Sequence, residues 1–349
     1  MRCSTNWRGK RAPPNLLRGE PMPSGEDRLI GRFFRPLARN PGAFDLHDDA
    51  AVITPPVGYD LVLTTDAVIE GVHFFPGDPA ADIARKALRA NLSDLAAKGA
   101  EPLGFLLTLA LPGRVDEEWV AAFADGLAAD IDAYKCPLLG GDTDSTPGLL
   151  SVAISAFGSV PHGKMVRRTG AKAGDAVVVT GTLGDSALGL ALRRDPQLAA
   201  RANLTAEEEA YLLNRYLLPQ PRSAMAKTLR EHAHAAMDVS DGLAGDALKL
   251  AGASNIAMEI NSTMLPLSSA SRKLVAFDPA LIETVCTGGD DYELLVAMPA
   301  TNVEPFQKQA GESGAVASVI GSVKNGEGAV ILDAKGKPIV FQRASFSHF

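Results

Sequence analysis

The chain has 349 residues, a length that favours two domains of about 150 residues each. Its 46% hydrophobic and 21% charged residues are typical of a soluble globular protein, and no apolar run reaches the ~20 residues of a membrane span. The formal charge of -7 argues against a nucleic-acid partner, and three cysteines without a CxxC spacing argue against a disulfide framework or a zinc site. We therefore expect a cytoplasmic protein.

Residues 1–23 are basic, contain prolines and show no apolar period, so we expect a disordered tail without a secretory signal. Met22 is a second candidate start of translation. It stands just ahead of a predicted amphipathic helix, whose apolar residues are Leu29, Ile30, Phe33, Phe34 and Leu37.

An N-terminal domain is expected over residues 24–160. In chain order it should contain a buried strand at 61–65 that ends on Asp66, a helix at 82–98, a strand at 105–111 and a helix at 116–134. Residues 140–143 follow, where two glycines should let the backbone amides approach a ligand closely. In the first of these helices Asp82 is the predicted N-cap and Gly99 the stop. Asn91 and Asp94, three residues apart, should face the same way.

The predicted boundary lies at Val160 to Gly163, and a C-terminal domain follows over residues 161–349. Its expected elements are strands at 175–180, 256–260, 292–298 and 316–323, with helices that open at Gly184-Asp185, cover 205–218 and cover 243–250. Both halves mix strands and helices in similar proportion.

Acidic residues recur at the predicted ends of these elements. Any one of them is usually a cap or turn residue, but the clusters are numerous and most have glycines beside them. Carboxylate oxygens are hard ligands that suit Mg²⁺, which keeps waters and bridges to phosphates. The clusters are Asp48-Asp49, Asp66, Asp94, Asp142, Asp238 with Asp241, and Asp290-Asp291.

Other chemistries lack their motifs. There is no P-loop, HExxH or GxSxG, and Gly181 to Gly184 fails the dinucleotide fingerprint. What remains is a phosphate site in which several Mg²⁺ ions, rather than one lysine, neutralise two polyanions, with Arg168 gripping donor phosphates. His73 lies in a loop beside acids, where a ligand contact and a plain turn role fit equally well.

The chain carries, in this order, DDAAVI, TTDAVIEGVHF, KALRANLSDLAAKGAEP, GGDT, RRTGAKAGD, TGTLGDSALGL, DVSDGLAGDA, GGDDYEL and FSHF. Together they resemble the thiamine-monophosphate kinase family, from about Gly25 to Phe349. That family shares a superfamily with aminoimidazole ribonucleotide synthetase and selenophosphate synthetase. The resemblance implies an α/β (α+β) fold with two domains, an N-terminal domain that binds ATP and Mg²⁺ and pairs in a homodimer, and transfer of a phosphoryl group from ATP to thiamine monophosphate.

The resemblance also implies residue roles. The positions expected to hold magnesium ions are Asp49, Thr64, Thr65, Asp66, Asp94, Asp142, Asp238 and Asp241. Those expected to contact ATP are Gly141, Asp142, Arg168 and Ser240. Those expected to meet thiamine monophosphate are His73, Asp290 and Phe346. Two positions depart from the family pattern: His47 replaces a glycine, and Asp290 stands where glutamate is common.

With no activated nucleophile in view, we expect direct in-line transfer, with Asp66 and Asp142 as catalytic residues that share a metal ion. Two other readings stay open. A purine-pathway synthetase of the same superfamily is one, and a non-catalytic nucleotide-binding sensor is the other. Selenophosphate synthetase and the hydrogenase maturation factor need cysteines near the N-terminal glycine-rich segment or at the C-terminus, where this chain has none in context.

Overall fold

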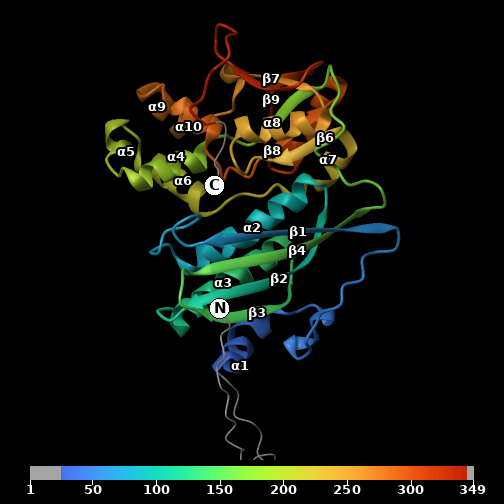
Figure 1. Cartoon of the computed structure of the whole chain (residues 1–349), viewed down its shortest axis with the longest axis vertical. Coiled ribbons are helices and arrows are strands. Elements are labelled where there is room, and N and C mark those ends of the chain that lie inside the picture. Colours follow the sequence, from blue (N-terminus) through green and yellow to red (C-terminus); the bar gives the residue numbers. More distant parts are fainter. Residues whose placement is uncertain (1–24, 344–349) are drawn as a thin grey trace, which may run out of the picture.

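The computed structural model of the chain describes residues 25–343, so the expected tail at 1–23 and Phe346 lie outside the described residues. Figure 1 shows an N-terminal half and a C-terminal half, each built from one sheet with helices against it. Helix α2 (Ala80–Ala97) runs along the junction between them. Within residues 25–343 no helix combines the length and apolarity needed to span a membrane.

The N-terminal sheet has four strands in the order β1-β4-β2-β3, with β2 and β3 parallel and the other pairs antiparallel. Helix α2 and helix α3 (Glu117–Tyr134) cover one face of this sheet through a common core. The opposite face, which we call the open face, carries the side chains of Leu61, Leu63 and Thr65. The strands are β1 (Tyr59–Ile69), β2 (Glu101–Pro112), β3 (Leu138–Thr146) and β4 (Ser151–Pro161).

Strand β1 differs from the prediction in length and burial. It continues through Asp66 to Ile69, so Asp66 lies inside the strand and not at its end. It is also an edge strand, and the side chain of Leu63 is 63% exposed because no described residue covers this part of the open face. A short apolar run could not distinguish a buried strand from a strand with one uncovered face.

Some helix termini follow capping chemistry. Asp116 caps α3 by accepting from Trp119 N, and Gly99, with φ +67°, lets the chain leave α2. The prediction for Asp82 is wrong: α2 begins after Pro79, and Asp82 lies in its first turn, where a carboxylate favours the positive end of the helix dipole.

The predicted N-terminal amphipathic helix is broken into short turns. Its apolar side chains still pack on the N-terminal core, but Pro36 lacks an N–H and prevents a continuous α-helix. The turns are α1 (Gly25–Leu29), the π-turn η1 (Ile30–Phe34), and the 3₁₀ turns η2 (Arg35–Leu37) and η3 (Pro41–Leu46).

The C-terminal sheet has six strands in the order β10-β7-β9-β5-β8-β6, and only the β10–β7 pair is parallel. Its strands are β5 (Ala176–Thr180), β6 (Ala235–Asp238), β7 (Ala257–Asn261), β8 (Leu294–Met298), β9 (Ala317–Lys324) and β10 (Gly328–Leu332). The helices are α4 (Asp185–Arg194), α5 (Leu198–Arg201), α6 (Ala206–Leu217), α7 (Ala226–His232), α8 (Leu243–Ser254), α9 (Ser269–Phe277), α10 (Leu281–Thr287) and α11 (Val303–Glu312). Three 3₁₀ turns complete it: η4 (Ser223–Met225), η5 (Ser262–Met264) and η6 (Ala300–Asn302).

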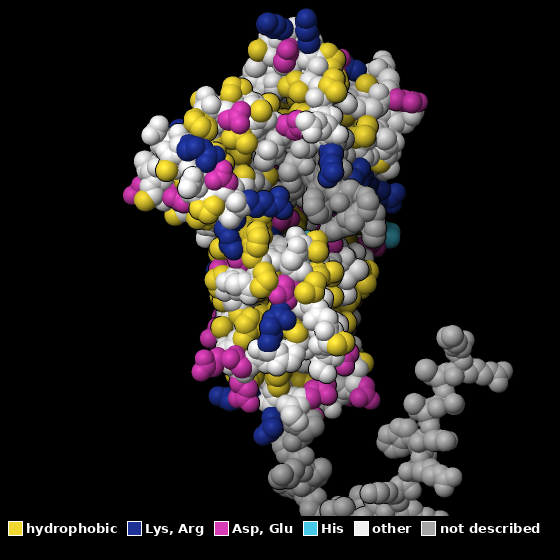
Figure 2. All heavy atoms as spheres, turned by 60° about the vertical axis from the view of Figure 1, so that its left-hand side comes forward, with side chains coloured by type: hydrophobic (Ala, Val, Ile, Leu, Met, Phe, Trp, Pro, Cys, Tyr) yellow, Lys and Arg dark blue, Asp and Glu magenta, His cyan; other side chains and the backbone are white. Residues whose placement is uncertain are grey.

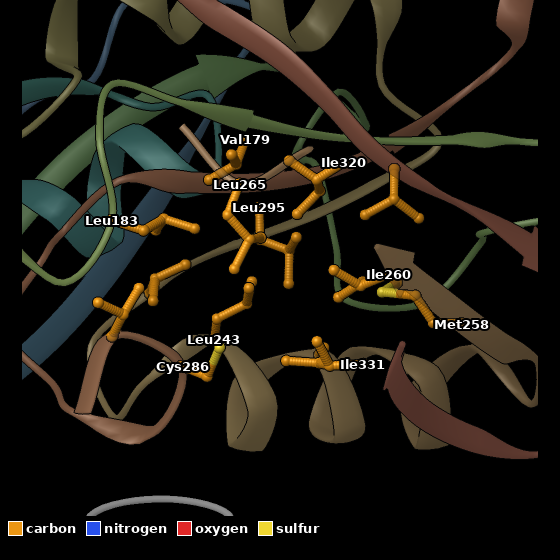
Figure 3. Packing of buried hydrophobic residues seen from close by; sticks show 14 of the residues in the cluster. Val179, Leu183, Leu243, Met258, Ile260, Leu265, Cys286, Leu295, Ile320 and Ile331 are labelled. Carbon is orange, nitrogen blue, oxygen red and sulfur yellow. The ribbon is translucent and has the colours of Figure 1, made fainter. Parts of the chain in front are cut away.

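The core of this half lies between one face of the sheet and helices that include α8. Figure 3 shows Val179, Leu295 and Ile320 from three strands meeting Leu243 at the start of α8. These side chains are fully buried, so the sheet and α8 form a firm support for the loops at the strand ends. One such loop follows β6 and another precedes β8, and both reach the junction.

Candidate functional site at the domain junction

Helix α2 presents different side chains to each half of the molecule. Lys86 and Ser93, seven residues apart, lie on one face and reach the C-terminal half, where they bond Asp290 and Asp238. Asn91 and Asp94 face β1: Asn91 accepts from Asp66 N at 3.0 Å, and Asp94 accepts from the hydroxyl of Thr64. The predicted common direction of Asn91 and Asp94 is confirmed.

Four carboxylates gather where α2, β1 and the loop after β6 meet: Asp66, Asp94, Asp238 and Asp241, which we call the junction carboxylates. Asp238 is 4% exposed and accepts a hydrogen bond of 2.7 Å from Ser93 Oγ. Asp241 is held differently, because Lys249 pairs with both Asp241 and Asp246. The group therefore draws residues from both halves of the chain.

Their mutual repulsion shows in their acidity. Partial burial and the charges of Asp94 and Asp241 raise the pKa of Asp66 to about 6. Burial and the charge of Asp94 raise the pKa of Asp238 to about 7, although the Ser93 hydrogen bond opposes the shift. Carboxylates with raised pKa values at close quarters gain most from a cation between them.

The junction carboxylates suit a Mg²⁺ ion that also keeps water and phosphate ligands better than a metal ion bound entirely by protein side chains. Among residues 25–343 no three His, Cys, Asp or Glu side chains converge as a ready-made metal site. Mg²⁺ usually keeps several waters and takes one or two carboxylates plus phosphate oxygens, so it does not require such convergence. Asp66, Asp94 and Asp238 would supply the carboxylates, and an ion there would offset the charge that two phosphate groups bring.

A second group of predicted residues lies on the open face. A cavity of about 880 Å³ between the N-terminal segment and the sheet is lined by Asp49, Gly141 and Asp142, among others. Thr65 is on the same face and accepts a hydrogen bond from Ser155, another residue of the cavity wall. The predicted metal ligands thus divide into two groups within one chain.

Asp66 and Asp142 belong to different groups. Asp66 pairs with Ile154, which is buried beneath the helices, whereas Asp142 pairs with Thr108 on the open face. Three strand spacings, roughly 14 Å, also separate β1 from β3. The expectation that these two residues share one ion is wrong for a single chain, because strand order, which the sequence does not show, puts them apart.

Gly141 explains how the Asp142 segment reaches its place. A Cβ on Gly141 would lie 1.8 Å from the carbonyl oxygen of Leu107, so only glycine lets β3 approach β2 this closely. The side chain of Asp142 accepts from Thr143 N at 3.0 Å. The close approach expected of the glycine backbone is therefore made by Gly141 to the neighbouring strand β2.

The paired acids Asp290 and Asp291 point in different directions. Asp291 is 1% exposed and accepts from Gly184 N at the start of α4, so it is a buried helix-end partner. Asp290 has a φ of +69° and accepts from Lys86 Nζ at 2.7 Å. Of the two, Asp290 faces the junction, as the resemblance implies.

His73 lies close to Asp290 through a shared partner. Its ring nitrogen Nδ1 accepts from Ile69 N at 3.0 Å, which fixes the imidazole, and its carbonyl oxygen accepts from Lys86 Nζ at 2.9 Å. The two residues expected to meet the acceptor are thus on opposite sides of one lysine. His47, which replaces a glycine of the family pattern, lies elsewhere and lines a separate cavity together with Glu117.

Sequence reasoning missed three residues of the site. Lys86 links His73 to Asp290. Lys98 reaches Ala236 O at 3.1 Å, and burial together with the charge of Arg168 lowers its pKa. Tyr292 is buried, and burial with the charges of Asp290, Asp66 and Asp238 raises its pKa well above its usual value. Helical spacing from Asp94 could have indicated Lys98, which lies four residues further on, but not Lys86.

Arg168 and Ser240, the expected ATP contacts, also come to the junction. The charge of Arg168 acts on Lys98, and Ser240 O accepts from Asp290 N at 2.8 Å, which ties the loop after β6 to the loop before β8. On the face drawn in Figure 2, several Lys and Arg side chains lie near the junction between the two halves. Cations and carboxylates therefore surround the same region.

The described cysteines do not provide a nucleophile. Cys136 and Cys286 are both fully buried, and burial raises the pKa of each thiol to about 12. A thiol with so high a pKa is almost entirely protonated near neutral pH.

Comparison with known proteins accounts for this arrangement. The family model "AIR synthase related protein, N-terminal domain" matches residues 47–160, and its C-terminal counterpart matches residues 172–333. The thiamine-monophosphate kinase of Caulobacter vibrioides is 40% identical over 93% of this chain and 91% of its own length. The chain belongs to the thiamine-monophosphate kinase family. The resemblance and the enzyme class expected from the sequence, a phosphotransferase, are confirmed.

Other members and solved structures agree. The Salmonella typhimurium thiamine-monophosphate kinase is 38% identical over 94% of this chain and 99% of its own length. The crystal structure from Stenotrophomonas maltophilia K279a gives a TM-score of 0.79 at 37% identity, covering 90% of this chain and 96% of that one. A structure described as AaThiL complexed with AMPPCP and TMP gives 0.74 at 33% identity, covering 86% and 91%. The two-domain α/β fold expected from the sequence is confirmed.

Proposed function

We propose that this chain transfers the γ-phosphoryl group of ATP to thiamine monophosphate with the help of Mg²⁺, and that thiamine diphosphate and ADP are the products. The similar structure described as AaThiL complexed with AMPPCP and TMP supports the choice of these two substrates. The observation that carries the proposal is the meeting of Asp66 and Asp94 from one half with Asp238 and Asp241 from the other, next to Asp290.

The reaction requires two polyanions to approach. An oxygen of the acceptor phosphate forms a bond to the γ-phosphorus, and the bond from that phosphorus to the β–γ bridging oxygen breaks, with ADP keeping the electron pair. Mg²⁺ supplies charge neutralisation when bound. The chain's own part is to hold the donor phosphates near Arg168 and Ser240 and the acceptor near His73 and Asp290, so that the reacting groups stand in line.

Direct transfer is part of this proposal, and it is supported by the two described cysteines, whose burial and pKa of about 12 make them poor nucleophiles. A γ-phosphate made chiral with oxygen isotopes and sulfur tests this point. One in-line displacement inverts the configuration at phosphorus, whereas retention would indicate a phosphoenzyme and contradict the proposal.

The activity itself is tested by incubating the purified full chain with ATP, Mg²⁺ and thiamine monophosphate and by separating the products. We expect thiamine diphosphate and ADP in equal amounts, and no product in excess EDTA. ADP formation that needs a purine-pathway substrate instead would favour the synthetase reading. Tight ATP binding without turnover of any acceptor would favour a sensor.

We also propose that two copies pair through their open faces in the cytoplasm. Leu61 and Leu63 are 38% and 63% exposed on a sheet whose other face is fully covered, and an uncovered apolar sheet face is a common interaction surface. Pairing there would also enclose the cavity that holds Asp49 and Asp142. We propose likewise that the boundary between the two domains lies near Val160.

A further inference from the structure

The ammonium group of Lys86 is buried between the two halves and has three acceptors. Its side chain is 3% exposed, and Nζ donates to His73 O at 2.9 Å, to Tyr216 O at 3.1 Å and to Asp290 Oδ2 at 2.7 Å. An ammonium group has three hydrogens, so its donor capacity is fully used. The acceptors come from the loop after β1, the end of α6 and the loop before β8.

Such a buried cation is a poor device for stability alone. Removing a charge from water costs several kcal/mol, and an apolar side chain of similar volume often serves as well or better. Lys86 is compensated by the carboxylate of Asp290 and by the ring of Tyr216, whose centroid lies 4.3 Å from Nζ. A lysine at this position therefore calls for a role that an apolar residue cannot perform.

Asp290 is held in an unusual conformation. Its φ of +69° is uncommon for a residue other than glycine, and such a conformation persists where the surroundings enforce it. Three contacts hold Asp290: its N–H donates to Ser240 O, and its carboxylate bonds both Lys86 and the side chain of Tyr292. Lys86 thus helps to fix the direction of this carboxylate, and it also joins Asp290 to the His73 loop.

The loop that carries His73 is anchored to the C-terminal half by a second cation. Arg193 of α4 pairs with the buried Asp78 at 2.5 Å and lies over the ring of Phe75, 4.7 Å from its centroid. With Lys86 bonded to His73 O, the loop is tied across the junction at both of its ends. Arg193 orients the far end, whereas Lys86 bonds both His73 and Asp290.

We propose that Lys86 is a positioning residue of the acceptor site, which holds the His73 loop and the Asp290 carboxylate at a fixed separation across the junction. This inference rests on the proposed function. It assigns no contact with the reacting atoms to Lys86. Its effect should therefore appear in the binding of thiamine monophosphate more than in the binding of ATP.

The test compares Lys86→Met and Lys86→Arg with the unmodified full chain. For Lys86→Met we expect KM for thiamine monophosphate to rise about 10- to 100-fold, the size expected when a charged hydrogen bond is lost, and KM for ATP to stay within about threefold. Lys86→Arg keeps the charge, but its planar fork cannot direct donors to three acceptors in the same way, so an intermediate KM is expected.

Arg89→Met is the matched control. Arg89 lies one turn further along α2, is equally buried, and bonds Asp130 and Pro219 O without touching His73 or Asp290. It should lower the melting temperature about as much as Lys86→Met and leave both KM values unchanged. If Arg89→Met raised KM for thiamine monophosphate equally, or if Lys86→Met raised both KM values together, Lys86 would have only a structural role.

Calorimetric titration of thiamine monophosphate in the absence of ATP distinguishes a failure of the inference about Lys86 from a failure of the proposed function. If the unmodified chain binds it and forms product, but Lys86→Met behaves identically, only the inference about Lys86 fails. If the unmodified chain neither binds it nor forms product, the proposed function fails, and the inference fails with it. The double variant Lys86→Met with Asp290→Asn should restore stability, because the buried ammonium group and its partner carboxylate are both gone, but not acceptor binding.

Discussion

The hydroxyl of Ser93 donates a hydrogen bond of 2.7 Å to the carboxylate of Asp238, and this contact helps to join helix α2 of the N-terminal half to the sheet of the C-terminal half. Both side chains are buried, Ser93 completely. The carboxylate has no cation bonded to it among the described residues, so the hydroxyl supports its charge. The link brings Asp238 within range of Asp94.

Ser93→Ala should destabilise the metal-free protein by about 1.5–3 kcal/mol, since a buried carboxylate loses a hydrogen bond. Urea unfolding at pH 8 with EDTA measures the change. Ser151→Ala is the control, because its hydroxyl makes only a long, exposed local contact, and a change below about 0.5 kcal/mol is expected there. In the Asp238→Asn background the effect of Ser93→Ala should shrink, and an unchanged effect would show that the two residues are not coupled.

The raised pKa of Asp238 predicts how stability depends on pH. Its pKa is raised from 3.8 to about 7, so between these values the folded metal-free protein binds more protons than the unfolded chain. Stability therefore falls as pH rises through that window. Asp238→Asn carries no charge, so its melting temperature relative to the unmodified chain should be higher at pH 8 than at pH 5 in EDTA. An equal difference at both pH values would contradict the assignment.

The stability that Mg²⁺ adds should increase with pH, in contrast to the stability of the metal-free protein. A proton and a metal ion compete for the same carboxylate oxygens, so Mg²⁺ binds better where the junction carboxylates are ionised. We expect the rise in melting temperature on adding Mg²⁺ to be larger at pH 8 than at pH 5, and to be reduced in Asp238→Asn. A rise that is independent of pH would place the ion elsewhere.

Gly141→Ala should disrupt the Asp142 segment. Its Cβ would meet Leu107 O at 1.8 Å, and a backbone neighbour can yield only if β2 or β3 shifts. We expect a loss of more than about 2 kcal/mol, in the range of severe backbone clashes. Gly140→Ala is the neighbouring control, since its Cβ would meet only the end of the Leu106 side chain at 3.3 Å. Equal losses in the two variants would contradict this account of the strand contact.

Asp66→Asn and Asp142→Asn should each lower kcat by roughly 10² to 10⁴, the range seen when a major electrostatic contribution to a transition state is removed. Steady-state rates at saturating Mg²⁺ measure the loss, with the exposed Asp144→Asn on β3 as a control expected to stay near unity. The double variant shows whether the two carboxylates act on one ion between subunits, in which case the effects are not additive. A loss below tenfold for Asp66→Asn would remove it from the proposed site.

Leu63→Glu should separate the proposed dimer. Light scattering of the unmodified chain at micromolar concentration should give about twice 36.6 kDa, and the variant should give one chain mass because a charge lies in the middle of the open face. Leu248→Glu, at a 47% exposed position on α8, is the control and should leave the mass unchanged. An active monomer of the unmodified chain would contradict pairing through the open face.

The sequence by itself determined the elements whose signals are local. The helices predicted over 116–134 and 205–218 are α3 and α6, and the structure begins them with the Asp116 cap and with the capping box of Thr205 and Glu208. The ordered motifs determined the family, and with it the two-domain fold. The motifs also identified the candidate metal-binding carboxylates, because the spacing of acidic residues and glycines can be read from the sequence.

Tertiary structure alone decided which of these residues meet. Strand order put β1 and β3 three spacings apart and strand register put Asp66 and Asp142 on opposite faces of one sheet, and no local pattern encodes either. The packing of α2 between the halves gave Lys86, Ser93 and Lys98 their partners 130 or more residues away, where only burial and geometry bring a donor to its acceptor. Backbone conformation decided the last point, since a positive φ at Asp290 turned it toward Lys86 while Asp291 stayed in the core.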